Sequence, residues 1–426
     1  MMNEQKLSFL ESKHFKNLAM EDGVKLDNLN ILIGPNCSGK SNVISMLKFL
    51  KDCVVASSED EQGGKYENAV SQLGGTNILD KNIAPPSDIN FRYHFSQTKT
   101  IPNGLSLDIK LFTGARNSRI TVKEESLCDS IQTRKTPFCY YKYHDKEVGK
   151  GVVSYHDDSL EKNSHFEDVE HIPNNSLGLD LTHKLLEKSG NPPERTPVYK
   201  IARELIDTIT AWHFYNANDM NLKKIRTSEP KIGPSDIYVS KSGHNLPLVI
   251  ENLIQQDINF EESLNKAMRS ILPMTRRLRP ARTGLMSINL QWHFQGVDEC
   301  FYLNEMSDGA VRMLCWATML LSPKIPNLLV IDEPELGLHV SWMPVLAEWI
   351  KMASEKTQVI ICTHSPDLLD CFTDQIENVR SFSSLDSKHF SIHPISKPNL
   401  QEKFDEGWQL GDLYRVGDPA VGGWPW

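Results

Sequence analysis

The order of apolar and polar positions divides this chain into two kinds of strand and a set of helices. Continuous apolar runs occupy 328–331 and 359–362, and the segment 29–33 is apolar except for Asn30. Such runs indicate strands buried on both faces of a sheet. Alternating segments, which indicate antiparallel strands with one solvated face, occur at 89–95, 105–112, 119–122 and 287–294. Shorter strands are expected at 7–10, 24–26 and 301–303, and helical spacing recurs at 42–51, 197–212, 245–255, 261–271, 306–321 and 341–353. The pattern predicts an α/β protein.

The segment between about residues 123 and 191 loses this periodicity and is rich in polar, charged and aromatic residues. We interpret it as an insertion of weak order or mixed structure. A chain of 426 residues exceeds the size at which a single core usually keeps growing. A main domain with an inserted or appended lobe is therefore expected.

The first apolar run leads directly into a glycine-rich loop, Gly34-Pro-Asn-Cys-Ser-Gly-Lys-Ser41, and then into a helix. This spacing is that of a phosphate-binding loop, whose backbone N–H groups surround a triphosphate while its glycines keep side chains away from it. Lys40 adds a positive charge near the β and γ phosphates, and Ser41 is placed to ligate Mg²⁺. We therefore expect ATP and Mg²⁺ to bind here. The residues expected at the nucleotide are Gly34, Pro35, Asn36, Cys37, Ser38, Gly39, Lys40, Ser41 and Asn42.

A pair of acids follows the second apolar run, in Leu328-Leu-Val-Ile-Asp-Glu-Pro-Glu335. Ligands of such sheets usually lie at the carboxyl ends of the strands. Asp332 would hold Mg²⁺ through water, and Glu333 would polarise the water that attacks the γ phosphate. An acid pair directly after four aliphatic residues thus predicts the hydrolytic part of the site.

The third apolar run also ends in a polar cluster, Thr363-His-Ser-Pro366. A lone histidine after a strand is often structural, but this one follows the acid-bearing strand and its helix. His364 is therefore predicted to contact the γ phosphate or the attacking water.

The net charge of −9 argues against a surface built uniformly to coat nucleic acid. A local exception is the arginine-rich strip at 274–282, which is either a solvated rim or a surface that contacts phosphates. Its arginines are Arg276, Arg277, Arg279 and Arg282.

The eight cysteines are scattered, with no C-x-x-C pair. We expect them to be reduced and packed, as in a cytosolic protein, rather than zinc ligands or a disulfide framework. The opening residues are polar and no apolar window approaches ~18 residues. The expected location is cytoplasmic, with no membrane span.

The motifs of this chain, taken in order, resemble those of the ATP-binding-cassette (ABC) type ATPases of the RecF, SMC and overcoming-lysogenization-defect (OLD) group. These motifs are the phosphate loop, Met306-Ser-Asp-Gly-Ala310, 328–335 and 363–366. The resemblance covers about 5–95 and 240–426. The segments 409–414 and 422–426 resemble the predicted AAA-family ATPases found beside nuclease genes in bacterial anti-phage defence loci.

The resemblance implies an ABC-type head with an antiparallel β subdomain and a helical or irregular insertion. The implied divisions are 1–122 and 240–426 for the two parts of the head and 123–239 for the insertion lobe. Heads of this group dimerise around two ATP molecules, so Ser307 and Gly309 would cap the γ phosphate of the partner's ATP. Glu333 would be the catalytic base and His364 the switch histidine, and Gln72, chosen over Gln62, would be the glutamine ligand of the metal.

The sequence departs from the known members of this group in three ways, and these departures limit the functions that the resemblance implies. The signature reads Ser-Asp-Gly instead of the transporter form Ser-Gly-Gly-Gln, the insertion lacks long heptad arms, and no Asp-x-Asp nuclease motif follows the ATPase. The leading expectation is a slow, regulatory ATPase that forms a homodimer or higher homo-oligomer and signals to a separate effector, a nuclease in anti-phage defence. The alternative is a RecF-like repair ATPase that binds DNA through the four arginines.

Overall fold

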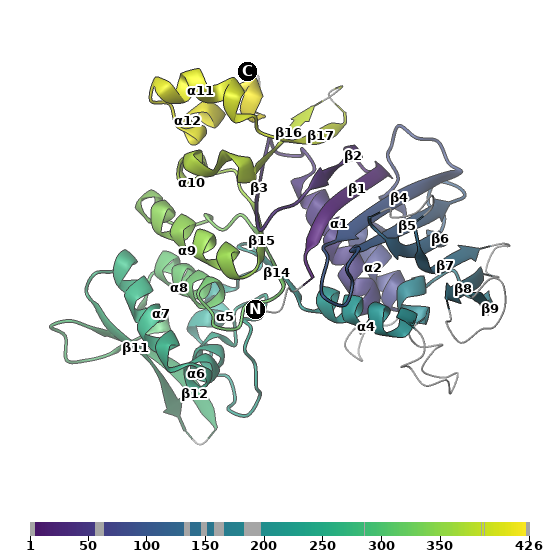
Figure 1. Ribbon diagram of the computed structural model, residues 1–426. Helices are drawn as coiled ribbons and strands as arrows, with labels where there is room; N and C mark the ends of the chain where they lie inside the picture. Colours follow the sequence, from purple (N-terminus) through teal and green to yellow (C-terminus); the bar gives the residue numbers. More distant parts are fainter. Residues whose placement is uncertain are drawn as a thin grey trace. The chain divides into compact units, whose positions relative to one another are not determined.

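The structure, a computed structural model, describes residues 5–55, 64–131, 137–145, 151–156, 166–182, 197–284, 286–384, 386 and 388–422. The chain folds into two compact units (Figure 1). Unit 1 comprises Met1–Asp27, Asn36–Trp212 and Phe382–His393, and unit 2 comprises Asn28–Pro35, His213–Ser381 and Pro394–Trp426. The chain crosses from unit 2 to unit 1 within the phosphate-loop sequence, after Pro35. The sequence-based division at residues 122 and 239 stays a prediction.

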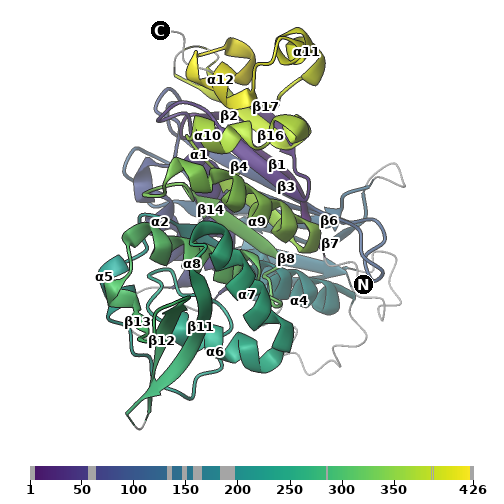
Figure 2. The ribbon, with the colours of Figure 1, turned by 90° about the vertical axis from the view of Figure 1, so that its left-hand side faces the viewer.

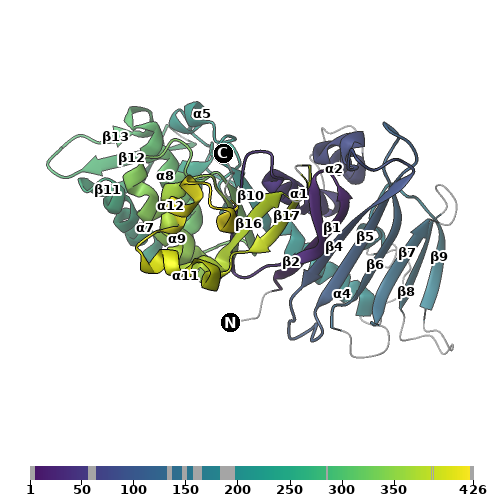
Figure 3. The same ribbon diagram turned by 90° about the horizontal axis from the view of Figure 1, so that it is seen from above.

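Unit 1 is built on a largely antiparallel sheet with strand order β17, β2, β1, β4, β5, β6, β7, β8, β9. Figure 3 shows β5 to β9 side by side. The strands are β1 (Leu7–Phe15), β2 (Leu18–Lys25), β4 (Ser87–Phe95), β5 (Leu105–Thr113), β6 (Thr121–Asp129), β7 (Cys139–Asp145), β8 (Gly151–His156), β9 (Phe166–Ile172) and β17 (Phe390–Pro394). The helices are α1 (Lys40–Val54), α2 (Lys65–Leu73) and α4 (Pro197–Thr210).

The two faces of this sheet differ as the alternation predicts. Along β4 the side chains of Phe91, Tyr93 and Phe95 are buried, whereas Arg92 between them is exposed. The buried face packs against α1, where the Tyr93 hydroxyl donates to the Met46 carbonyl at 2.9 Å. Burying these aromatic rings stabilises the sheet by roughly 2–3 kcal/mol each.

Strands β7 to β9 occupy the segment that the sequence predicted to be an insertion of weak order or mixed structure. In β7, Tyr141 and Tyr143 are buried and alternate with the exposed Lys142 and His144. Buried and exposed positions alternate with a period of two residues, as in other strands. The buried positions are tyrosines, which count as weakly hydrophobic, so the average hydrophobicity of the segment does not reveal the strand.

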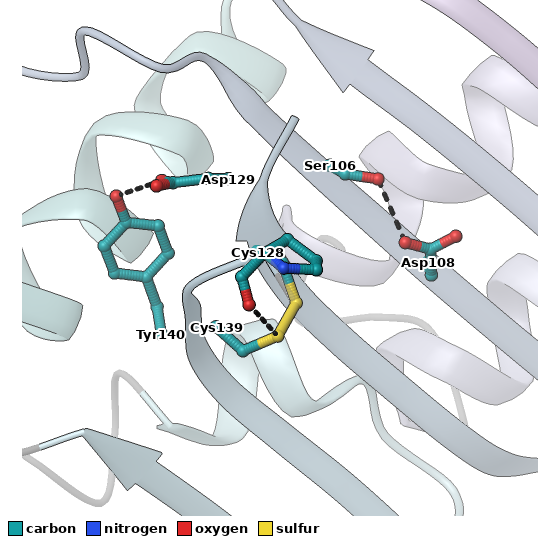
Figure 4. The surroundings of a disulfide bond; sticks show 7 residues. Ser106, Asp108, Cys128, Asp129, Cys139 and Tyr140 are labelled. Carbon is teal, nitrogen blue, oxygen red and sulfur yellow. Dashed lines mark hydrogen bonds between the residues drawn. A yellow bond between two sulfur atoms is a disulfide. The ribbon is translucent and has the colours of Figure 1, made fainter. Parts of the chain in front are cut away.

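The expectation that all cysteines are reduced is wrong for two of them. Cys128 of β6 and Cys139 of β7 are cross-strand neighbours and form a disulfide (Figure 4). The sequence could not show this because the two thiols come together only when β6 pairs with β7. The other six cysteines are free thiols, of which Cys53, Cys315 and Cys362 are buried.

Unit 2 is built on a sheet that contains the three strands predicted from the apolar runs, which pair in parallel. The strand order is β10, β14, β15, β3, β16, and β14, β15, β3 and β16 pair in parallel. Every residue of β3 and β15 is buried. The strands are β3 (Leu29–Ile33), β10 (Trp212–Asn216), β14 (Leu328–Asp332), β15 (Gln358–Cys362) and β16 (Val379–Ser384).

The helices of unit 2 enclose one large core with these strands. Figure 2 shows α8 and α9 stacked beside β14. The helices are α5 (Leu222–Arg226), α6 (Leu246–Gln256), α7 (Ile258–Ile271), α8 (Asp308–Leu320), α9 (Met343–Lys356), α10 (Pro366–Asp370), α11 (Lys397–Asp405) and α12 (Leu410–Arg415). No helix in the described ranges has the length and apolar character to cross a bilayer.

A second, antiparallel sheet in unit 2 contains β11 (Thr275–Thr283), β12 (Ser287–Phe294) and β13 (Phe301–Tyr302). The arginine-rich strip is therefore a strand. Leu278 of β11 and its neighbour Trp292 of β12 are buried, whereas Arg276, Arg277, Arg279 and Arg282 are exposed.

Candidate nucleotide-binding and hydrolysis site

The phosphate-loop sequence has the backbone that close approach to an anion requires. Gly39 has φ +102°, and a Cβ there would lie 2.5 Å from Leu18 Cδ2. Cys37 adopts φ +65° although it is not glycine. Left-handed residues turn successive N–H groups toward one side of a loop and so create an anion-binding concavity.

A turn between β1 and β2 supports the part of the loop that lies in unit 1. The Asn17 side chain donates to the Cys37 carbonyl at 2.8 Å and accepts from Asn42 Nδ2 at 2.8 Å. Lys16 Nζ donates to Asn42 Oδ1 at 3.1 Å, and burial lowers the pKa of Lys16. Sequence reasoning missed both Lys16 and Asn17, because their role depends on which turn packs beneath the loop.

The two side chains expected to act on phosphate and metal begin α1. Lys40 is buried, with its Nζ 3.4 Å from Ser38 Oγ, and Ser41 is exposed. Gly39, the residue before the helix, offers no side-chain cap. The first turn of α1 thus retains backbone donors of the kind that bind anions at helix N-termini.

The predicted acid pair lies at the carboxyl end of β14 in unit 2. Asp332 Oδ2 accepts from Asn216 Nδ2 at 2.9 Å, and Glu333 Oε2 accepts from Asn218 Nδ2 at 3.1 Å. Glu333 has φ +53°, which is costly for a residue with a Cβ. Such outliers concentrate at functional sites, and the two amides hold both carboxylates in place. The sequence signal for the amides is Asn-x-Asn, which begins at the last residue of β10.

A third carboxylate, Glu335, connects this loop to the histidine segment. Its Oε1 accepts from Thr363 Oγ1 at 2.7 Å and from the His364 N–H at 3.0 Å. Burial raises the pKa of Glu335, and the nearby Glu333 charge also raises it, against the hydrogen bonds. No sequence motif singles out Glu335. The structure shows that it fixes the backbone that carries the predicted switch histidine.

The signature residues lie at the start of α8. Ser307 is exposed and caps the helix, with its Oγ accepting from the Ala310 N–H at 3.3 Å. A Cβ on Gly309 would lie 2.9 Å from Trp342 Cζ3, so this glycine lets α8 approach the segment after β14. Arg226 of α5 bonds Asp308 at 2.7 Å. The start of α8 is therefore held by a side-chain cap and an ion pair, and Ser307 faces solvent in the single chain.

The structure thus brings Asp332, Glu333 and His364 to neighbouring strand ends of unit 2, since β14 and β15 pair in parallel up to Asp332 and Cys362. Gln72 is an exposed residue of α2 in unit 1. Its alternative, Gln62, and the terminal residues 423–426 lie outside the described residues.

The fold and these motifs define the class as a P-loop ATPase of the ABC/AAA type. A family model described as "AAA domain, putative AbiEii toxin, Type IV TA system" matches residues 29–370. The chain belongs to this family. The predicted resemblance and fold class are confirmed, and membership of a P-loop ATPase family implies nucleotide binding, usually with Mg²⁺.

The chain is also similar to individual proteins. The "Retron Vc95 probable ATPase" of Vibrio cholerae serotype O1 biovar El Tor is 21% identical over 417 residues, which span 92% of this chain and 76% of that protein. The SmcHead in a crystal structure with the C-winged helix domain of ScpA has a TM-score of 0.51 at 12% identity, over 92% of this chain and 99% of that chain. The SMC head domain from Thermotoga maritima has a TM-score of 0.42 at 13% identity, with the same coverage.

Proposed function

We propose that this chain binds and slowly hydrolyses ATP and that two copies complete each other's nucleotide sites. The observation that carries the proposal is the placement of Ser307, an exposed serine that caps the start of a helix of 13 residues. Such helix starts bind phosphate. A partner's triphosphate supplies the ligand that this exposed end is built to receive.

The surface around the signature supports a protein contact. Leu336 and Val340 are 37% and 52% exposed and flank the segment that packs on Gly309. Exposed apolar residues beside a polar binding element are typical of an interface between subunits. We therefore place the homodimer contact on the N-terminal end of α8 and the 336–342 segment.

The chemistry of the site follows from its donors. By the resemblance to ABC-type ATPases, Ser41 and Asp332 would ligate Mg²⁺, which prefers oxygen ligands. The metal would neutralise charge on the phosphates when bound. Glu333, held by Asn218, orients and deprotonates the attacking water, and His364, held by Glu335, contacts the γ phosphate. Gln72 would complete the metal ligands after nucleotide binds.

Hydrolysis serves as a signal in this proposal. The similarity to a retron-associated probable ATPase and to an AbiEii-type family supports a role in bacterial anti-phage defence, with a separate effector, a nuclease, as the partner. A regulatory ATPase needs long-lived ATP-bound dimers, which is why turnover is expected to be slow.

The test is complementation between two inactive variants. Lys40→Ala removes the charge at the phosphate loop, and Ser307→Arg blocks the signature, so each homodimer is inactive. In a mixed dimer one site combines the intact loop of one copy with the intact signature of the other, and a 1:1 mixture should recover about one quarter of wild-type ATPase activity. Mass spectrometry of the intact complexes checks that mixed dimers form. If they form and the ATPase activity of the mixture stays at the level of the separate variants, the shared site is contradicted.

A second candidate function is DNA binding by β11, because Arg276, Arg277, Arg279 and Arg282 are all exposed there. One of them is already engaged, since Arg277 Nε lies 2.5 Å from Glu261 Oε1. Replacing the four with alanine should weaken duplex binding at low salt and flatten its salt dependence. Undiminished binding in that variant, or none in the wild type, removes this candidate.

A further inference from the structure

The C-terminal helix α12 contacts two parts of the nucleotide site that the sequence separates widely. The Tyr414 hydroxyl donates to the carbonyl of Gly34, the first residue of the phosphate loop, at 3.0 Å. A loop that turns its N–H groups toward an anion points carbonyls outward, and those carbonyls need partners. Tyr414, a half-buried residue, supplies a partner for the first of them.

The same helix is fixed to α10, which begins just after His364. The Gly411 N–H donates to Asp370 Oδ1 at 2.7 Å, and the Leu410 N–H donates to Thr373 Oγ1 at 2.9 Å. A Cβ on Gly411 would lie only 2.0 Å from the Pro366 carbonyl. No side chain fits at this position without moving α12 away from α10.

A third connection runs through the buried carboxylate described above. Burial raises the pKa of Tyr414, and the charge of Glu335 raises it further. Glu335 in turn binds Thr363 and the His364 N–H. The phenol therefore senses the charge of the group that holds the histidine segment, and it donates directly to the phosphate loop.

We propose that α12 is a positioning element of the nucleotide site and that it acts through Tyr414. The hydroxyl holds the first peptide of the phosphate loop, and Gly411 keeps the helix against the segment that carries His364. Nucleotide binding and docking of α12 then stabilise each other, because any such coupling is reciprocal. The inference rests on the proposed nucleotide site.

The first measurement is nucleotide affinity in the full chain, with fluorescent ATP and Mg²⁺. Tyr414→Phe removes one hydrogen bond and keeps the ring, so the dissociation constant should rise about 3- to 10-fold. The matched control is Tyr140→Phe, whose hydroxyl donates to Asp129 Oδ1 at 2.8 Å between β7 and β6 of unit 1 (Figure 4). The control should lose stability but keep wild-type affinity.

The second measurement separates coupling from simple stability. ATP should slow hydrogen exchange at 410–415 in the wild type and not in Tyr414→Phe. Gly411→Ala should lower affinity by a similar factor, and the double variant should add little, because both changes break one connection. If α12 only supports the fold, ATP should not change hydrogen exchange at 410–415, and the effects of the two variants on affinity should not overlap in this way.

The outcomes distinguish this inference from the proposed function. If wild type and Lys40→Ala bind ATP equally, the nucleotide site itself is wrong. If only Lys40→Ala loses binding, while Tyr414→Phe keeps wild-type affinity and α12 still responds to ATP, the positioning role is overturned and the ATPase remains.

Discussion

The two units place their polar side chains differently. On the solvated face of unit 1, charged residues spread along the strands and pair with one another, as in Arg92 with Glu11 and Lys110 with Glu124. In unit 2 the central strands β14 and β15 are mostly apolar and buried, and polar groups gather where these two strands end. Paired charges on an open sheet contribute little energy. Polar groups held at strand ends by amides and backbone donors are fixed in position, as a reaction requires.

The largest expected effect comes from the unit 2 side of this comparison. Glu333→Gln should lower the rate of ATP hydrolysis at least about 100-fold, because a positioned base contributes that much, and the ATP-bound dimer should accumulate. Turnover is measured by phosphate release and dimerisation by light scattering. The matched control is Glu124→Gln in unit 1, which breaks a surface ion pair and should leave turnover unchanged. Wild-type turnover in Glu333→Gln would refute the assigned base.

The next effect concerns a buried acid in unit 1. Glu125 accepts hydrogen bonds from Tyr141 and from the Gly178 and Leu179 N–H groups, yet burial raises its pKa from 4.5 to about 7. The native state therefore binds more protons than the unfolded state between these pH values, so stability falls as pH rises through this window. The loss from this group should reach about 3 kcal/mol.

Denaturant unfolding at pH 5 and pH 8 measures this loss. Glu125→Gln should show a smaller decline between the two pH values than wild type, because its amide does not ionise. A decline equal to that of wild type would mean that Glu125 does not titrate in this range. A pH dependence of this kind would show that the buried carboxylate of unit 1 affects the stability of the fold, in contrast to the carboxylates proposed for catalysis in unit 2.

The smallest expected effect comes from Glu335, the third acid of unit 2, and it tests whether this residue acts through its hydrogen bonds. Glu335→Ala leaves the Thr363 hydroxyl and the His364 N–H without their acceptor, which should lower the free energy of unfolding by about 1–3 kcal/mol. Glu335→Gln keeps an acceptor oxygen and should retain most of the stability and the turnover. Equal losses in both variants would show that the negative charge, rather than the hydrogen bonds, is what matters.

The sequence determined the parts whose signal is local. A run such as 328–331 is apolar because both faces are buried, and the glycine spacing at 34–39 follows from the backbone that an anion-binding loop needs. These patterns predicted β3, β14, β15, α1 and α8 and identified the ATPase class.

Tertiary structure alone decided the residues that act through distant partners. Asn17, Glu335 and Tyr414 hold backbone groups of the site, the last across 380 positions of sequence. The Cys128–Cys139 disulfide likewise needed the pairing of β6 with β7. A polar side chain that satisfies a remote carbonyl or N–H leaves no periodic trace, because its position depends on chain packing and not on its neighbours in sequence.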